Sequence, residues 1–376
     1  MKIAIVVNSA WAAYNFRNNL AQFLEQAGHK ITFFIPNDGD YSKRLKKEFT
    51  CVYYFINAKS LNPGVDFKTF LDLLIGFKNV HPDVVLNFTI KPNIYSTLAA
   101  KVYAIPVINN ITGLGTVFIK ESLITFLVKG LYKFCMSHAT LVFFQNSHDL
   151  SYFVQNKLIT EKKCKLLPGS GVDTHRFKPS ENIYKADKFI FLLIARLLKD
   201  KGIYEFIDAI RFIKANYIKQ SVEFQLLGEV GVNNQTAIGI EEVNSWVNEG
   251  LVNYLGVTDK VEEIIIHCDC IVLPSYREGM PRTILEGFAM AKPAIVTDVP
   301  GCKDIVDHEV NGLICKAQSS EDLAEKMILM IDMQEGARVK MGQSGRKKVE
   351  NLFDEKTVLN SYLNEINKIE SYEKDI

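Results

Sequence analysis

The 376-residue sequence lacks several features that would place it in other classes of protein. No apolar run reaches the roughly 20 residues of a membrane-spanning helix. The apolar stretch Ile3–Val7 is too short for a signal peptide and predicts a first strand. Neither the seven cysteines nor the seven histidines show metal-ligand spacing, and the cysteines suggest no disulfide framework. We therefore expect a globular, cytoplasmic chain with reduced cysteines and no bound metal.

A dinucleotide-binding fingerprint is also missing. No Gly-x-Gly-x-x-Gly follows the first strand, and no acidic residue ends the second strand at the required place. Asp38-Gly-Asp40 is similar to the metal-binding Asp-x-Asp of other transferases, but its place after the second strand predicts a turn. These absences argue against a dehydrogenase.

The net charge of +1 conceals an asymmetry between the two halves of the chain. Residues 1–180 contain 21 Lys and Arg against 11 Asp and Glu, a net of +10, and the remainder carries −9. A basic first half favours an anionic partner, such as a membrane surface or a lipid diphosphate. Charge alone does not distinguish these from nucleic acid, and unequal solvated surfaces are the plain alternative.

Apolar strands alternate with amphipathic helices, and the pattern restarts after Pro179, which predicts two doubly wound α/β domains. We place them at residues 1–178 and 179–354, with a C-terminal helix over about 355–376 that packs back on the first. Loops of the two domains would face a cleft, the usual ligand position in such folds. Strands are predicted at Lys2–Val7, Lys30–Ile35, Val84–Asn87, Val107–Asn110, Phe189–Ile194, Phe224–Leu227, Cys270–Leu273 and Ala294–Val296. Helices are predicted at Phe16–Gln26, Asp66–Lys78, Ile94–Val102, Ile203–Ala215, Val261–His267, Thr283–Ala291, Glu321–Met333, Ala337–Leu352 and Glu355–Ile369.

Two carboxylates mark the most informative segment. Glu278 follows an apolar strand and lies in a loop, and Glu286 lies about one turn inside the next helix. A helix N-terminus attracts anions such as a diphosphate, and neighbouring carboxylates accept hydrogen bonds from sugar hydroxyls. A nucleotide-sugar site is the resulting hypothesis.

A basic pair has a similar setting. Arg196 and Lys201 follow another buried strand and precede a helix. A guanidinium and an ammonium at that position would neutralise a leaving diphosphate. The alternative is a solvated basic turn.

These segments carry a family resemblance. Arg196-x4-Lys201, Leu227-Gly-Glu229, Tyr254-Leu-Gly256 and Pro274-Ser-x-x-Glu278-Gly-x-Pro-x-x-x-Leu-Glu286 resemble the family 4 retaining glycosyltransferases, as do Asp298–Cys302 and Asn311-Gly312. The resemblance implies the GT-B fold of two facing Rossmann-like domains. It also implies transfer of a sugar from a nucleotide diphosphate sugar to a hydroxyl, with retention of configuration and no metal.

The same resemblance assigns roles on the donor side. Glu286 would hold the ribose hydroxyls, Glu278 would contact the donor sugar, and Arg196 and Lys201 would bind the diphosphate as the catalytic cations. The backbone at Gly279, Met280 and Thr283, around the helix N-terminus, would approach the sugar or phosphate. Gly228 would let the backbone approach the nucleotide, or be a simple turn glycine. Val257 and Thr258 would lie beside the base, with a plain loop as the alternative.

In the first domain the resemblance is looser. Asn8–Arg17 has no glycine where relatives have a glycine pair, and Arg17 would face phosphate or cap a helix. Thr112 stands where many relatives have histidine, and Gly113 and Gly115 fit a tight loop below the donor. Lys91 and Asn93 would face the acceptor, although a solvated lysine is an open alternative.

The acceptor is predicted from likeness to bacterial surface-polysaccharide enzymes, through Ser60–Pro63 and Ile111–Gly115. It would be linked to undecaprenyl diphosphate, with a UDP-linked N-acetylhexosamine or hexose as donor and no nucleic-acid partner. The segment Phe118–Phe134 is largely apolar and carries Lys120, Lys129 and Lys133, so it would touch the anionic inner membrane surface or pack in the core. A nucleotide-sugar epimerase and a non-catalytic nucleotide-sugar-binding protein are the rival functions.

Overall fold

The structure is a computed structural model that describes residues 1–58, 60, 62–113, 123–180, 188–217, 221–232 and 234–374. It divides into two compact units: unit 1 comprises Met1–Ser170 and Val358–Ile376, and unit 2 comprises Gly171–Thr357. The division thus falls eight residues before the predicted one. Val172 and Thr174 explain the difference, because the Val172 N–H donates to the Phe353 carbonyl (3.0 Å) and the Thr174 hydroxyl to Asp354 (2.5 Å).

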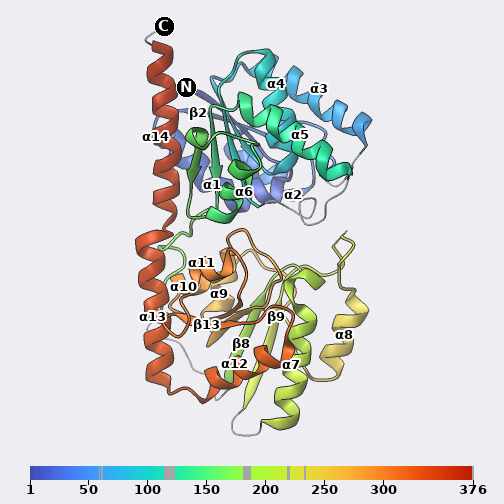
Figure 1. The fold of residues 1–376 in the computed structure, drawn as a ribbon, viewed down its shortest axis with the longest axis vertical. Helices are drawn as coiled ribbons and strands as arrows, with labels where there is room; N and C mark the ends of the chain where they lie inside the picture. Colours follow the sequence, from blue (N-terminus) through green and yellow to red (C-terminus); the bar gives the residue numbers. More distant parts are fainter. Residues whose placement is uncertain are drawn as a thin grey trace. The chain divides into compact units, whose positions relative to one another are not determined.

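Unit 1 is built on a parallel sheet of seven strands in the order β3-β2-β1-β4-β5-β6-β7 (Figure 1). Its strands are β1 (Lys2–Val6), β2 (Lys30–Ile35), β3 (Thr50–Tyr53), β4 (Val84–Phe88), β5 (Val107–Ile111), β6 (Leu141–Phe144) and β7 (Cys164–Leu166). Its helices are α1 (Ala10–Gln26), α2 (Asp40–Glu48), α3 (Pro63–Val80), the π-helix η1 (Pro92–Ser96), α4 (Thr97–Val102), α5 (Leu123–His138), α6 (Ser147–Gln155) and the 3₁₀ turn η3 (Glu161–Lys163).

Alternate residues of the central strands face two different helical layers, as strand geometry requires. Ile3 and Ile5 of β1 pack in one core with α1, α2 and α14 (Glu355–Lys374). Ala4 and Val6 pack in the other, with α3 and α4. Because both faces are covered, the strands are mostly apolar rather than alternating, although β4 contains the buried Asn87 and β5 the buried Asn109 and Asn110.

Helix α1 begins at Ala10, earlier than the start predicted at Phe16, so most of the segment Asn8–Arg17 is helical. The Ser9 side chain caps the helix by accepting the Ala12 N–H (3.4 Å). Asp38, predicted to be part of a plain turn, accepts the Ala10 N–H (3.1 Å) from the loop after β2. Arg17 therefore lies inside the helix and does not cap it.

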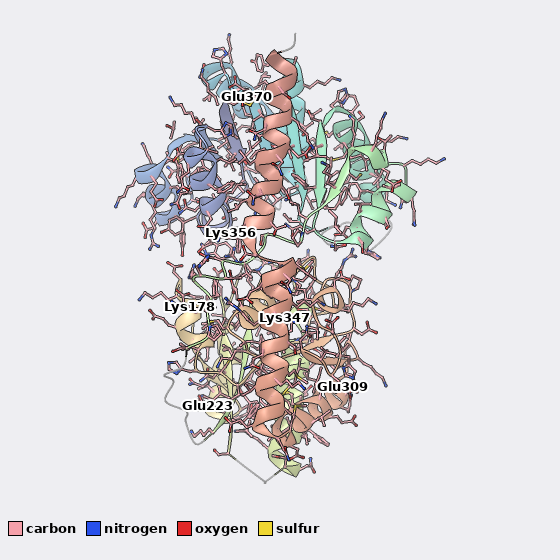
Figure 2. All side chains as sticks on the ribbon, turned by 90° about the vertical axis from the view of Figure 1, so that its left-hand side faces the viewer. Lys178, Glu223, Glu309, Lys347, Lys356 and Glu370 are labelled. Carbon is pink, nitrogen blue, oxygen red and sulfur yellow. The ribbon has the colours of Figure 1, made fainter. Side chains whose placement is uncertain are left out.

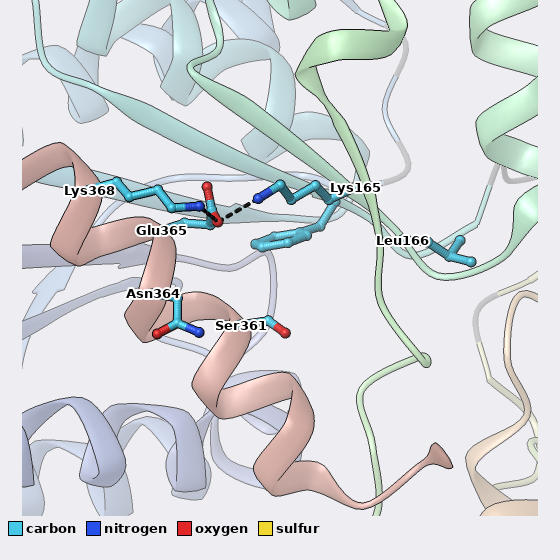
Figure 3. A pocket seen from close by; sticks show the side chains of 7 residues that line it. Lys165, Leu166, Ser361, Asn364, Glu365 and Lys368 are labelled. Carbon is cyan, nitrogen blue, oxygen red and sulfur yellow. Dashed lines mark hydrogen bonds and ion pairs between the residues drawn. The ribbon is translucent and has the colours of Figure 1, made fainter.

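After Thr357 the chain returns to unit 1, where most of α14 lies against the sheet (Figures 1 and 2). Tyr362 is fully buried and accepts a hydrogen bond from the Asn110 side chain (2.6 Å). Further along α14, Glu365 forms ion pairs with Lys165 (2.6 Å) and Lys368 (2.8 Å), as Figure 3 shows. A pocket of about 400 Å³ lies beside them, and no predicted site residue lines it.

Unit 2 has a second parallel sheet, in the order β10-β9-β8-β11-β12-β13 (Figure 1). Its strands are β8 (Phe189–Ile194), β9 (Val222–Leu227), β10 (Asn253–Tyr254), β11 (Cys270–Leu273), β12 (Ala294–Thr297) and β13 (Gly312–Cys315). Its helices are the 3₁₀ turn η4 (Lys199–Lys201), α7 (Ile203–Asn216), α8 (Ile240–Asn248), α9 (Val261–Ile265), α10 (Arg282–Ala289), α11 (Cys302–Ile305), α12 (Ser320–Asp332) and α13 (Glu335–Leu352).

Candidate functional site

The predicted donor residues gather at the carboxyl edge of the unit 2 sheet, at its topological switch point. The chain leaves β8 toward β9 on one side, whereas β11 lies on the other side of β8. In open α/β sheets this is the usual place for a ligand. The loops after β8 and β11 touch here: a Cβ on Gly202 (φ +71°) would lie 2.0 Å from the Pro274 carbonyl oxygen. Only glycine fits, and the approach brings Lys201 next to Glu278.

Lys201 and Glu278 form an ion pair across these two loops. The Lys201 Nζ lies 2.5 Å from Glu278 Oε1, and the Ser275 hydroxyl donates to the same oxygen (2.7 Å). The two side chains are only 22% and 12% exposed, so the pair is weakly screened by solvent. A second link, from the Tyr276 N–H to the Asp200 carbonyl (2.9 Å), holds the loops together.

Glu286 lies in the fifth position of α10 and is 8% exposed. Burial raises the pKa of its carboxyl group, and the neighbouring guanidinium groups of Arg282 and Arg176 oppose that rise. Arg282 Nε donates to Glu286 Oε1 (2.9 Å), and Arg176 itself pairs with Glu262 (2.7 Å). The two cations only partly offset the effect of burial, so the protonated form of Glu286 is favoured more than in a solvated glutamate.

The N-terminus of α10 is built from the predicted Glu278–Pro281 loop. Pro281 precedes the first helical residue and offers no side-chain cap. N–H groups in a first helical turn have no partner within the helix and carry partial positive charge. Gly279 packs against the loop after β12, where a Cβ on Gly301 would lie 2.5 Å from its carbonyl oxygen. Met280 is half-buried and packs on the unit 2 core, and Thr283 is the second residue of the helix.

The other predicted donor residues are arranged less closely. Arg196 is exposed, and no acidic partner is seen for it in the described part of the chain. Gly228 is more than a turn glycine, since a Cβ there would lie 1.8 Å from the Ala195 carbonyl oxygen. Val257 is 68% exposed on the loop after β10. The Thr258 hydroxyl accepts the Lys260 N–H (3.0 Å), a local turn that fits the plain-loop alternative as well.

In unit 1, Lys91 is neither solvated nor available as a free cation. Its Nζ lies 2.5 Å from Asp66 and donates to the Ser60 carbonyl (2.6 Å). Both side chains are 11% exposed, and Tyr95 donates to the second Asp66 oxygen (2.8 Å). The solvated-lysine alternative is therefore wrong. Any acceptor phosphate would have to compete with Asp66 for this ammonium.

Asn93 and Arg17 are buried at the carboxyl edge of the unit 1 sheet. The Asn93 amide donates to the Asn110 carbonyl (2.9 Å), while its own Oδ1 has no hydrogen-bond partner among the described residues. The Arg17 guanidinium stacks 4.0 Å from the centre of the Phe88 ring. Thr89, directly after β4, has a left-handed φ of 74°, which is uncommon outside glycine.

Thr112 and Gly113 follow β5, the strand next to β4, so they lie at the same edge as Lys91 and Asn93. Gly113 has a φ of +147°, and no atom of the described residues lies within 4 Å of where a Cβ would be. Gly115, Phe118 and Lys120 lie outside the described residues.

Sequence reasoning missed three groups of residues in these sites. Arg282 stands four residues before Glu286, a helical spacing that predicts an ion pair and was a usable signal. Ser275 also lies within the recognised motif, three residues before Glu278. Asp66 could not be found in this way, because its partner Lys91 is 25 residues away. Across the described ranges, no group of three or more His, Cys, Asp or Glu side chains could hold a metal ion.

Two family models match the chain. Residues 174–348 match the model "Glycosyl transferases group 1", and residues 2–146 match "Glycosyl transferase 4-like". One curated relative is the N,N'-diacetylbacillosaminyl-diphospho-undecaprenol alpha-1,3-N-acetylgalactosaminyltransferase of Campylobacter jejuni, 29% identical over 96% of this chain and 97% of its own. Another is the UDP-Gal:alpha-D-GlcNAc-diphosphoundecaprenol alpha-1,3-galactosyltransferase of Escherichia coli, 24% identical over 71% of each chain.

Solved structures agree on the fold. A glycosyltransferase from Rickettsia africae superposes with a TM-score of 0.80 at 20% identity, over 98% of both chains. Anabaena HepE, solved in complex with UDP-glucose, gives 0.77 at 17% identity, over 98% of this chain and all of its own. The predicted GT-B fold is confirmed, with its two Rossmann-like units. The chain belongs to the group 1, family 4-like glycosyltransferases.

Proposed function

We propose that the protein transfers a hexose or N-acetylhexosamine from a UDP-sugar to a glycan linked to undecaprenyl diphosphate, with retention of configuration. The pathway would be that of a bacterial O-antigen, capsule or exopolysaccharide, at the inner face of the cytoplasmic membrane. The relatives support this choice, because the names of two of them specify acceptors linked to undecaprenol through a diphosphate. The observation that carries it is the Lys201–Glu278 pair at the switch point of the unit 2 sheet.

The chemistry proposed for this edge is electrostatic. As the bond between the anomeric carbon and the β-phosphate oxygen breaks, negative charge grows on the phosphate and positive charge on the sugar. Lys201, Arg196 and the first-turn N–H groups of α10, near Thr283, would stabilise the phosphate charge without a metal ion. The acceptor hydroxyl attacks from the side of the leaving group, and its proton passes to the departing phosphate oxygen.

The two carboxylates would hold the sugars of the donor. Glu278 would accept hydrogen bonds from donor-sugar hydroxyls, and its link to Lys201 would couple sugar position to phosphate position. Glu286 would hold the ribose, with Arg282 occupying one carboxylate oxygen and leaving the other for a hydroxyl group. Gly279 and Met280 would line the sugar, and Gly228, Val257 and Thr258 the nucleotide.

Unit 1 would bind the acceptor through the carboxyl edge of β4 and β5. Asn93, Thr112 and Gly113 are the proposed contacts, and Arg17 would support Phe88 beneath them. Lys91 would act through its Asp66 pair, which fixes its position, and would turn toward an acceptor phosphate only when that pair opens.

The test is a transfer assay on purified protein. UDP-sugars are offered in turn with a polyprenyl-diphosphate-linked monosaccharide, and UDP release and lipid-glycan mass are followed. Acceptor-dependent UDP release with a mass gain of one sugar is expected, unchanged by EDTA. Glu278→Gln should abolish transfer, whereas Lys199→Ala, which removes an exposed lysine of the same turn, should not.

Two results would reject the proposal. An isomerised sugar formed without acceptor would identify an epimerase. UDP binding with no turnover on any acceptor would identify a binding protein.

A further inference from the structure

The outer faces of three neighbouring helices in unit 1 expose many large apolar side chains. Helices α3, α4 and α5 lie side by side over one face of the sheet (Figure 1). Phe67, Leu71 and Ile75 of α3 are spaced by four residues and form one stripe along the helix. The set is completed by Val102 and Tyr103 at the end of α4 and by Leu131 and Phe134 of α5. Large apolar side chains exposed on neighbouring helices in this way are typical of an interaction site.

Positive charge accompanies this apolar surface. The three helices contain two aspartates and five lysines, namely Lys68, Lys78, Lys101, Lys129 and Lys133. Both aspartates are already engaged: Asp66 pairs with Lys91, and Asp72 accepts the Phe55 N–H (2.9 Å). The surface is therefore apolar and basic at once.

Several of these lysines lie over aromatic rings. The Lys68 Nζ is 4.6 Å from the centre of the Phe55 ring, and the Lys101 Nζ is 4.5 Å from that of Phe134. In such pairs the ring face attracts the ammonium, which places positive charge beside the exposed aromatic side chain. Phe134 and Lys101 come from α5 and α4, so the pair also joins the two helices into one surface.

We propose that the outer face of α3, α4 and α5 docks on an anionic lipid bilayer. The inference rests on the proposed function, since it supplies the membrane contact that a lipid-linked acceptor requires. Apolar side chains would enter the boundary between headgroups and acyl chains, and the lysines would lie at the lipid phosphates. Charge complementarity selects this partner, because the net charge of residues 1–180 is +10 and the face holds no unengaged carboxylate among its described residues.

The experiment is vesicle flotation of the full-length protein with phosphatidylcholine alone or with added phosphatidylglycerol. Phe67→Gln/Ile75→Gln changes two side chains that are 59% and 58% exposed, so folding should be unaffected. It should weaken partitioning onto anionic vesicles by about tenfold or more, because two interfacial apolar side chains are lost. A matched control, Phe212→Gln/Leu352→Gln in unit 2, should bind like wild type; its residues are 46% and 54% exposed.

A charge variant tests whether the lysines of this face contribute to binding anionic vesicles. Lys68→Ser/Lys78→Ser should weaken binding by about fivefold per lysine. Added salt should reproduce this loss, because it screens the same charges. Phosphatidylcholine vesicles without anionic lipid should bind wild type weakly.

Transfer assays separate this inference from the proposed function. The Phe67/Ile75 variant should transfer sugar normally to a short-chain, water-soluble prenyl-diphosphate acceptor and poorly to a vesicle-embedded one. Equal vesicle binding by variant and wild type would overturn the inference while leaving the transferase proposal intact. If wild type shows no turnover but the variant still binds vesicles less well, the transferase proposal is rejected and the membrane-docking inference stands. A wild-type dimer that becomes monomeric in the variant would show that a second copy covers this face, and would also overturn the inference.

Discussion

Removing the Lys201 ammonium should reduce both catalysis and stability, and the two effects can be separated. Lys201→Met keeps the length of the side chain and deletes its charge. Because the pair is mostly buried, the variant leaves the Glu278 carboxylate with a desolvation cost that is no longer offset. The expected loss is about 1–3 kcal/mol of unfolding free energy. In a domain of this size it corresponds to roughly 2–4 °C of melting temperature per kcal/mol.

Catalysis should fall further than stability alone explains. An ammonium that stabilises charge developing on the leaving phosphate is worth about 100- to 1,000-fold in kcat. The double variant Lys201→Met/Glu278→Gln removes both charges, so much of the lost stability should return through a coupling of about 1–3 kcal/mol. Its transfer activity should nevertheless stay as low as that of Lys201→Met.

The assay combines thermal melts with acceptor-dependent UDP release for the two single variants, the double variant and Lys199→Met. Lys199 is an exposed lysine in the same 3₁₀ turn, and its variant controls for general loss of positive charge. A Lys201→Met protein that melts early but turns over at the wild-type rate would refute the catalytic role. The ion pair would then only join the loops after β8 and β11.

Three further predictions follow from single contacts. Burial raises the pKa of the Glu286 carboxyl group in the folded protein above its value in the unfolded chain, so protonation of Glu286 favours the folded state. This contribution to the free energy of unfolding is fully present below about pH 4.5 and is lost as the pH rises through the folded-state pKa. Glu286→Gln should therefore gain melting temperature over wild type from pH 4.5 upward while weakening UDP binding, measured by calorimetry. Gly202→Ala places a Cβ 2.0 Å from the Pro274 carbonyl oxygen and should lower the free energy of unfolding by more than 3 kcal/mol, measured by denaturant melts. Gly250→Ala is the control and should lower it by only about 1 kcal/mol, because the left-handed Gly250 has no described atom within 4 Å of where a Cβ would lie. Tyr362→Phe should lower the free energy of unfolding by about 1–2 kcal/mol, because it leaves the Asn110 side-chain N–H without its acceptor. The loss should be seen as early unfolding of unit 1.

The elements predicted best are those with strong local patterns. The strand at Lys30–Ile35 is found at its predicted limits, and the helix predicted at Ala337–Leu352 is found as Glu335–Leu352. Short edge strands such as Thr50–Tyr53 and Cys164–Leu166 were missed, because three or four residues carry too little periodicity. The start of α1 was misplaced for another reason. Its first turn is held by Asp38, a residue 28 positions away that no local pattern connects to Ala10.

The site shows the same division between local and distant information. Glu278, Glu286 and Lys201 could be proposed from the sequence because each lies in a motif that connects a strand to a helix. The buried pairing of Lys91 with Asp66 could not, since it depends on α3 lying beside η1. Likewise, spacing alone left Gly228 as either a ligand contact or a turn. The structure adds a third reason for the glycine, the approach of its backbone to Ala195.

Three such approaches, at Gly202, Gly228 and Gly301, bring the loops of the unit 2 carboxyl edge together backbone to backbone. Loops in this contact have little room to rearrange, so under the proposed function the Lys201 ammonium and the α10 N-terminus would already be oriented before a donor binds. Preorganised charges stabilise a developing phosphate charge without a reorganisation cost during the reaction. Burying an ammonium beside a carboxylate is expensive in itself. We propose that a bound diphosphate offsets part of this cost as a second anionic partner of the Lys201 ammonium, which stays linked to Glu278 beside the donor sugar.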